Sequence, residues 1–238
     1  LLFNEGRVSE RYRARNISVH IEPENVSFFS LTKACKERLE KLSPRLIVAH
    51  GYKEILVAWL CARSLRIPFI PVFHGRAEPH PGFAGVKLGF YEYLALFVAR
   101  IFATAIICVS RALAKDLGLH GLSKLRVVYN SHTRRGESTT SERGIFSHRP
   151  AIYMIGRLVR VKRIDLALEV LKGFLQSGPA KLYVAGNGPE EASLVEKAKT
   201  LGITDKVEFL GFREDAAEII AESDVFLLTS DSEGVPTV

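Results

Sequence analysis

Cysteine, methionine and tryptophan are scarce in this chain of 238 residues, which holds three cysteines, one methionine and one tryptophan. An odd number of widely spaced cysteines provides neither a disulfide framework nor the paired ligands of a structural zinc site. Each cysteine stands in an apolar context, as Cys61 does within residues 57–62 and Cys108 within residues 106–109. We therefore expect all three, including Cys35, to be buried and reduced thiols.

A long uncharged apolar run is also missing. The most apolar stretch, residues 94–109, is 16 residues long and contains Arg100. A membrane-spanning helix needs about 20 predominantly apolar residues and rarely carries a charge, so this stretch predicts a buried helix followed by a strand. The chain is 47% hydrophobic and 25% charged, which is typical of soluble globular proteins.

Acidic residues are few in the first part of the chain. Residues 1–149 hold 23 Lys+Arg against 12 Asp+Glu, a net +11, whereas residues 150–238 hold 10 against 14, a net −4. This asymmetry favours an anionic partner for the first part, such as a membrane surface or an acidic acceptor. An ordinary solvated basic surface explains the same pattern. No motif that reads nucleic acid accompanies the charge, so we expect no nucleic-acid partner.

Apolar runs alternate with helical patterns along the whole chain, which predicts an α/β fold with parallel sheets. Residues 132–149 lack an apolar period and are rich in Ser, Thr and Gly, so they predict a linker between domains 1–131 and 150–238. We expect strands at 17–21, 46–50, 68–73, 105–109, 126–129, 151–155, 181–185, 207–210 and 225–229, and helices at 31–42, 54–66, 90–103, 111–117, 164–176, 190–201 and 214–222.

Four polar blocks follow apolar runs in the last third of the chain, where α/β proteins place their ligand loops. The first holds two cations five residues apart, which suit phosphate oxygens, although two surface cations would look the same. A glycine-rich block permits close backbone approach to a ligand, or a plain turn. Together with a carboxylate, these blocks predict a ligand with a diphosphate and several hydroxyls: Arg157 and Lys162; Gly186 to Gly188; Phe212 and Arg213; Glu233, Gly234 and Val235.

In this order the four blocks resemble the carboxyl-terminal domain of GT-B glycosyltransferases, most closely the retaining family 4, the glycosyl transferases group 1. The resemblance covers nearly the whole chain and is strongest from Ile152 to Val238. It implies two Rossmann-like domains with parallel sheets (GT-B). It also implies a nucleotide-sugar donor held mainly by the second domain, and sugar transfer in the cleft between the two.

The resemblance also implies roles for single residues of the second part. Arg157 and Lys162 would hold the donor diphosphate and stabilise the leaving group. Glu233 would approach the sugar. The remaining donor-binding positions would be the glycine loop at Gly186 and Gly188, the base contacts Phe212 and Arg213, and the amides of Gly234 and Val235.

Two His-Gly pairs follow apolar runs in the first part of the chain. His74 and Gly75 match the family's His-Gly position, which faces donor and acceptor, so the resemblance implies a catalytic role for His74 beside Glu233. His50 and Asn130 would lie with Gly75 on the acceptor side. A structural role for His50 is an equally simple interpretation, because a lone histidine at a strand end is more often structural.

The function implied by the resemblance is hexosyl transfer in polysaccharide biosynthesis. The donor would be UDP- or GDP-linked and the acceptor a glycan, a lipid or a small molecule. The anomeric configuration would be retained, and neither a metal nor a cofactor is expected. The expected location is the cytoplasm, with peripheral contact to an anionic membrane at its inner face. Two alternatives stay open: a non-catalytic nucleotide-sugar-binding remnant and a sugar-nucleotide epimerase of the same fold.

We expect both domains to be incomplete. The chain starts at Leu1 without a methionine, and it ends at Val238, two residues after a proline. The first strand with its acceptor loop would precede Leu1. The second glutamate of the family's Glu-x7-Glu motif would follow Val238. On this interpretation the chain by itself is inactive.

Overall fold

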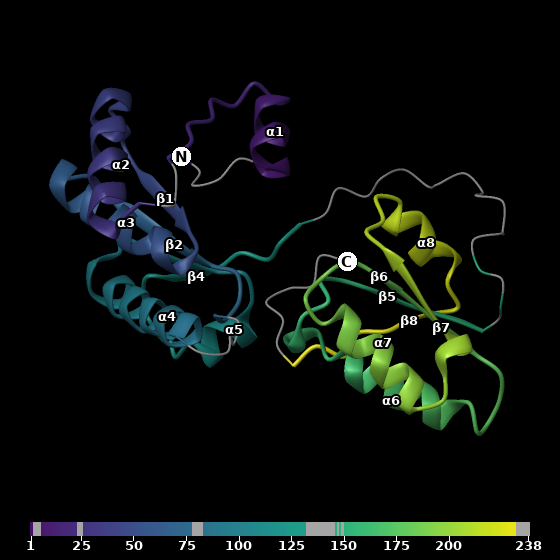
Figure 1. Cartoon of the computed structure of the whole chain (residues 1–238). Coiled ribbons are helices and arrows are strands. Elements are labelled where there is room, and N and C mark those ends of the chain that lie inside the picture. The colour runs from purple at the N-terminus through teal and green to yellow at the C-terminus, as the bar shows by residue number, and fades with distance from the viewer. Residues whose placement is uncertain are drawn as a thin grey trace. The chain divides into compact units, whose positions relative to one another are not determined.

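The computed structural model describes residues 1, 6–22, 26–77, 83–131, 146, 148 and 150–231. The chain divides into two compact units, Leu1–Asn130 and Ser131–Val238, and each unit is built around its own parallel sheet (Figure 1). The alternation of apolar runs and helical patterns predicted parallel sheets, and both units confirm it.

The first unit contains a four-stranded sheet in the order β1-β2-β3-β4. All three strand pairs are parallel. Parallel strands need crossover connections, and one helix lies between β1 and β2, one between β2 and β3, and one between β3 and β4. The elements are α1 Arg7–Arg13, α2 Phe28–Leu42, β1 Ile47–His50, α3 Tyr52–Leu65, β2 Phe69–Phe73, α4 Phe83–Phe102, β3 Ile106–Cys108, α5 Arg111–Asp116 and β4 Leu125–Val127.

The three cysteines are buried and unpaired, as the sequence predicted. Cys35 of α2 packs with Cys61 of α3 in a small apolar cluster that joins the two helices. Burial raises the pKa of Cys35 to about 11 and that of Cys61 to about 12, so both stay protonated at neutral pH. They serve as small apolar side chains in this core.

The second unit contains a four-stranded sheet in the order β7-β6-β5-β8, again with parallel pairs. Helices α6 and α7 cover one face of this sheet and α8 the other (Figure 1). The elements are β5 Ala151–Ile155, a 3-10 turn η1 Arg160–Lys162, α6 Ile164–Phe174, β6 Lys181–Ala185, α7 Glu191–Thr200, a second 3-10 turn η2 Thr204–Lys206, β7 Val207–Gly211, α8 Ala216–Glu222 and β8 Val225–Phe226.

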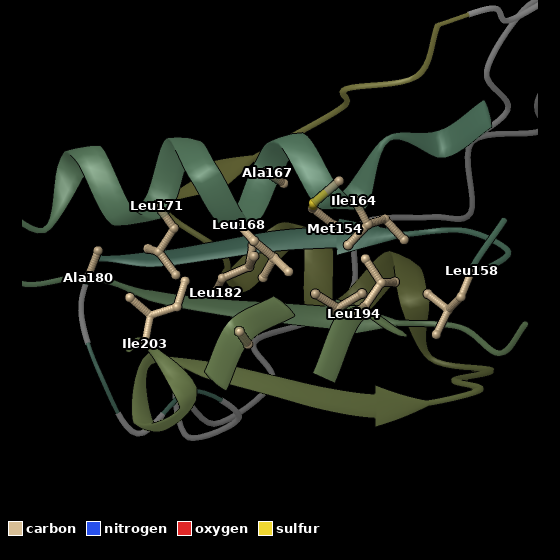
Figure 2. Packing of buried hydrophobic residues seen from close by; sticks show 12 residues of the cluster. Met154, Leu158, Ile164, Ala167, Leu168, Leu171, Ala180, Leu182, Leu194 and Ile203 are labelled. Atoms are coloured by element: carbon tan, nitrogen blue, oxygen red, sulfur yellow. The ribbon is translucent and has the colours of Figure 1, made fainter. Parts of the chain in front are cut away.

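Side chains of β5 alternate between two apolar clusters, as the period of two along a strand requires. Met154 joins Leu168 and Leu171 of α6 in the larger cluster, where these side chains lie between the helix and the sheet (Figure 2). Tyr153 points to the opposite face and packs with Phe146. Phe146 falls within the predicted linker, yet it is only 8% exposed and belongs to the core of the second unit.

Four details of the sequence-based prediction are wrong. The strand expected at 225–229 ends at Phe226. Residues 17–21 form no strand, since only Ile21 makes an isolated bridge among them, and a short apolar alternation without a neighbouring strand gains no ladder. Helix α1 was not predicted. Helix α4 begins at Phe83, seven residues before its predicted start, because packing overrides the helix penalty of its two early glycines.

Candidate functional site

The carboxyl ends of strands β5, β6 and β8 surround a small depression in the second unit. The stem of Lys162 lies over Gly156, such that a Cβ on Gly156 would be 3.5 Å from Lys162 Cε. Lys162, in the turn η1, is half-buried. Arg157 follows β5 by two residues and is exposed. The depression is lined by Met154, Ile155, Gly156, Lys162, Ile164, Val184, Leu228, Thr229 and Ser230.

Two glycines let the loop after β6 press against the loop after β5. A Cβ on Gly186 would collide with the carbonyl oxygen of Gly156, and the φ of Gly186 is +135°, a conformation that side chains disfavour. A Cβ on Gly188 would collide with the carbonyl of Leu158. Leu158 in turn donates its amide to the carbonyl of Asn187 at 3.0 Å. The glycines are therefore required by contact between the two loops, and their role toward a donor stays a prediction.

The segment after β8 is tied to the turn that carries Lys162. The hydroxyl of Thr229 donates to the carbonyls of Lys162 at 2.9 Å and Arg163 at 2.8 Å. Asp231 donates its amide to the carbonyl of Val161 at 2.9 Å. These bonds bring the start of the Ser230–Glu233 block to the turn that holds Lys162. Glu233, Gly234 and Val235 lie outside the described residues.

Arg163 holds this junction together, although the sequence suggested no role for it. Its φ of 49° places it in the left-handed region between η1 and α6. Its Nε donates to Asp165 at 3.1 Å and its Nη1 to Asp231 at 3.0 Å. A non-glycine residue with positive φ is the kind of signal that a structure shows and a sequence does not.

Phe212 and Arg213, predicted at the nucleotide base, follow β7. Phe212 is 52% exposed. The guanidinium of Arg213 donates from Nε to Asp215 at 2.8 Å and from Nη2 to the other oxygen of the same carboxylate. This fork holds the pKa of Asp215 below its usual value. Arg213 is thus committed to the residue that precedes α8, and a base contact by Arg213 stays a prediction.

In the first unit, His50 and His74 come together at the ends of the neighbouring strands β1 and β2. His50 Nδ1 lies 2.7 Å from His74 Nε2, and the two rings stack with centroids 5.0 Å apart. Burial lowers the pKa of both imidazoles, and the nearby His74 lowers that of His50 further. A neutral pair suits this bond, in which one ring donates and the other accepts.

Two residues that the sequence analysis missed hold the loop after His74. The hydroxyl of Tyr52 donates to the carbonyl of Gly75 at 2.6 Å, and burial raises the pKa of this phenol. The amide of Ala77 donates to Glu92 of α4 at 3.0 Å, and Arg76 lies 3.2 Å from the same carboxylate. Glu92 is 7% exposed. Glu92 is the single acid of a largely apolar helix, and this feature of the sequence could have indicated a buried carboxylate with polar partners.

Asn130 stands at the end of the first unit, three residues after β4, and its side chain is exposed. No bond in the described residues ties it to His50 or Gly75, so its acceptor-side role stays a prediction.

Among the described residues, no three His, Cys, Asp or Glu side chains gather as ligands for a metal ion. In the same part of the chain no helix combines the length and the apolar character that a membrane crossing requires.

Two family models match the chain. The model described as Glycosyltransferase Family 4 matches residues 3–131, and the one described as Glycosyl transferases group 1 matches residues 137–238. The first of these covers more than half of the chain, and together they cover nearly all of it.

Curated relatives match the chain over part of their own length. N-acetyl-alpha-D-glucosaminyl L-malate synthase of Bacillus anthracis is 34% identical over 92 residues, which are 39% of this chain and 24% of that enzyme. TuaC of Bacillus subtilis is 29% identical over 222 residues, which are 88% of this chain and 52% of TuaC. The chain thus spans about half the length of TuaC and less of the synthase.

Solved structures share the fold. The structure of HepE from Anabaena in complex with UDP and glucose superposes with a TM-score of 0.82 at 20% identity, over 99% of this chain and 67% of HepE. TarM superposes with a TM-score of 0.71 at 17% identity, over 87% of this chain and 41% of TarM. At this identity the likeness establishes the GT-B architecture of two Rossmann-like units.

Proposed function

The chain belongs to Glycosyltransferase Family 4, and from that premise we propose that it moves a sugar from a nucleotide-sugar donor to a glycan, lipid or small-molecule acceptor. The donor nucleotide is UDP or GDP, and the anomeric configuration is retained. HepE, which has the same fold, was solved with UDP-glucose, and this supports UDP as the first nucleotide to test.

The observation that carries this proposal is the cationic edge of the second sheet. Lys162 lies over Gly156 beside the depression at the ends of β5, β6 and β8, and Arg157 follows the same strand. A guanidinium grips phosphate oxygens in a fork and an ammonium adds a point charge. A nucleoside diphosphate leaving group develops negative charge at its terminal phosphate as the glycosidic bond breaks. Cations held at that position stabilise the transition state without a metal.

Residues at the sugar are proposed from the family resemblance. His74 is proposed to act on the transferred sugar, and its hydrogen bond to His50 fixes which ring nitrogen is left for a substrate. Glu233, with the amides of Gly234 and Val235, is proposed to hold the sugar. The tie between Thr229 and the carbonyl of Lys162 supports this, because it holds the described segment that precedes Glu233 in the chain beside the turn that carries Lys162.

Calorimetric titration of UDP and GDP tests the donor site. Arg157→Ala and Lys162→Ala should each weaken binding by about 1.5–3 kcal/mol, the usual cost of one charged hydrogen bond. Arg160→Ala is the matched control. Arg160 is exposed and lies between Arg157 and Lys162 in the chain, and its substitution removes one positive charge as the other two do. Equal affinity of all three variants and the unchanged protein would overturn the diphosphate site.

Product analysis separates transfer from its alternatives. The full-length protein that contains this chain should be incubated with a panel of UDP- and GDP-sugars and candidate acceptors, and the anomeric configuration of the product read by NMR. An acceptor-linked product of retained configuration supports the proposal. A sugar whose configuration has changed, and which is not linked to any acceptor, would indicate an epimerase. Tight nucleotide-sugar binding with no product would indicate a non-catalytic binding protein.

The charge of the first unit supports a further part of the proposal, attraction to an anionic membrane. Residues 1–130 hold 19 Lys+Arg against 10 Asp+Glu, a net +9. Such a surface raises the local concentration of anionic partners over roughly the 10 Å screening length at 0.1 M salt. A lipid-linked acceptor would then be met at the surface where it resides.

A further inference from the structure

Helix α4 carries apolar side chains on the face that it turns to solvent. Along that face the exposed fractions are 72% for Val86, 59% for Phe90, 70% for Tyr93, 46% for Phe97 and 53% for Ile101. Their spacings of four, three, four and four residues put all five on one stripe of the helix. We call this stripe the α4 face.

The opposite side of α4 is packed within the first unit. Ala95, Val98 and Ala99 are at most 1% exposed, and Glu92 is 7% exposed. A surface helix of a soluble protein usually places polar residues on its outer side, whereas α4 is apolar on both sides. Contiguous exposed apolar surface of this kind marks a place where a protein meets a membrane or another protein.

Charge decides between these two partners. The charged residues of α4 are Lys87, Glu92 and Arg100. The acid is buried on the packed side, while both cations are exposed, and at 100° per residue they fall on either side of the α4 face. Arg100 reaches to the carbonyl of Leu117 at 2.9 Å, which keeps its charge at the border of the stripe. The exposed side of the helix thus combines apolar side chains with positive charge alone.

Aromatic side chains of α2 and α3 contact α4 on the side away from the α4 face. The ring of Phe28 lies 6.5 Å from Tyr91 of α4 and 5.9 Å from Phe29, which is 81% exposed. At the other end of the helix, Trp59 of α3 lies 5.2 Å from Phe102. Trp59 is the single tryptophan of the chain, so its fluorescence reports on the packing of α3 against α4.

We propose that the α4 face docks into the headgroup region of an anionic bilayer, with its aromatic rings in the outer acyl region and Lys87 and Arg100 at the phosphates. This combination of an apolar face with bordering cations is what interfacial helices use. A second copy of the chain fits less well, because two units of net +9 repel each other. The inference rests on the proposed attraction to an anionic membrane, and it names the surface that makes the contact.

Vesicle sedimentation tests this contact. The probes are vesicles of phosphatidylcholine alone and of phosphatidylcholine mixed with phosphatidylglycerol. The unchanged chain should sediment with the mixed vesicles. Part of the binding should persist at about 1 M salt, where screening shortens to about 3 Å and only apolar insertion remains.

The variant Phe90→Ser/Phe97→Ser removes two exposed rings and leaves the charge unchanged. It should bind mixed vesicles about tenfold or more weaker and lose the salt-resistant fraction, since it removes two apolar rings that would insert among the acyl chains. Val170→Ser/Phe174→Ser is the matched control, because these side chains are 50% and 46% exposed on α6 of the second unit. UDP titration of each variant verifies that the second unit is folded, and circular dichroism does so for the whole chain.

The outcomes separate the surface from the attraction. If the unchanged chain binds vesicles and Phe90→Ser/Phe97→Ser binds them equally well, the α4 face is not the contact surface, although the attraction to anionic lipid remains. No binding by the unchanged chain would overturn both. A dimer in sedimentation equilibrium that the same two substitutions dissociate would assign the face to a second copy, and would also overturn the proposal.

Discussion

His50 Nδ1 and His74 Nε2 lie 2.7 Å apart, so two imidazoles at the ends of adjacent strands share one hydrogen bond. The residues are 24 positions apart in the chain, and the parallel register of β1 and β2 brings them together. A fully protonated pair cannot make this bond, because an imidazolium ring offers donors only.

Stability should fall as the pH is lowered through the range in which free histidine takes up a proton. Burial lowers the pKa of both rings below their ordinary value of 6.5. Below about pH 6.5 the unfolded chain binds protons that the folded chain refuses, so their contribution to stability is complete above that pH and declines beneath it. Thermal unfolding between about pH 7.5 and 5.5 measures this slope.

Replacing either ring isolates the contribution of the pair to that slope. His50→Gln and His74→Gln should each flatten the dependence of the melting temperature on pH. His120→Gln, at an exposed histidine of the same unit, should leave it as it was. A slope that is identical in all three variants would mean that other groups produce it.

Tyr52→Phe should destabilise the first unit by about 0.5–1.5 kcal/mol. The hydroxyl that donates to Gly75 at 2.6 Å is lost, and the carbonyl behind His74 loses its partner. Urea unfolding gives the difference. Tyr93→Phe removes a hydroxyl from a side chain that is 70% exposed and should change stability little, so an equal loss in both would contradict the role of Tyr52.

Gly186→Ala and Gly173→Ala should have opposite effects on the second unit. The new methyl at position 186 would meet the carbonyl of Gly156 at a φ of +135°, and backbone strain alone costs about 1–3 kcal/mol. A methyl at position 173 meets nothing within 4 Å and lies in α6, where alanine gains roughly 0.5–1 kcal/mol over glycine. Denaturant midpoints compare the two, and a neutral Gly186→Ala would refute the tight approach of the loops.

Thr229→Val should weaken UDP binding while the fold persists. Its hydroxyl is donated to the carbonyls of Lys162 and Arg163, and without it the turn that carries Lys162 loses its tie to the segment after β8. A lost hydrogen bond of this kind corresponds to about 2–10-fold in affinity. Thr200→Val removes a comparable hydroxyl at the end of α7, and its titration should match that of the unchanged chain.

Transfer should proceed without a divalent metal. Arg157 and Lys162 are proposed to meet the leaving-group charge that a metal meets in other enzymes. Nucleotide release by the full-length protein in the presence of excess EDTA should equal its release in the absence of EDTA. Loss of turnover that Mn²⁺ or Mg²⁺ restores would show that the cations are insufficient.

The two central strands of the second sheet, β5 and β6, could be predicted closely from the sequence because most of their residues are buried. The runs 151–155 and 181–185 are continuous apolar segments of strand length bounded by polar blocks, and both match β5 and β6. The start of α4 was placed too late because local propensity counts Gly85 and Gly89 against a helix. Packing against the rest of the unit decides that boundary, and a local window does not contain it.

The candidate site was predictable in its positions but less so in its contacts. Parallel topology brings the ends of β5, β6 and β8 to one edge of the sheet, where Gly156, Lys162 and Thr229 line the depression. The hydrogen bonds that join these segments are accepted by backbone carbonyls, such as those of Lys162 and Leu158. Every residue has such a carbonyl, so the residue types do not reveal these bonds. The partnership of Arg213 with Asp215 is local, and a search for acids two residues away would have found it.

The interlocked loops after β5 and β6 limit how donor preference can be re-engineered. Leu158 donates its amide to Asn187 and accepts the amide of Glu190, while Gly188 leaves the space that the Leu158 carbonyl fills. A graft that replaces one loop with that of a relative would break both bonds and place a foreign backbone against an unmatched surface. Residues 156–158 and 186–190 are therefore a single exchangeable module, to be transplanted together or left alone.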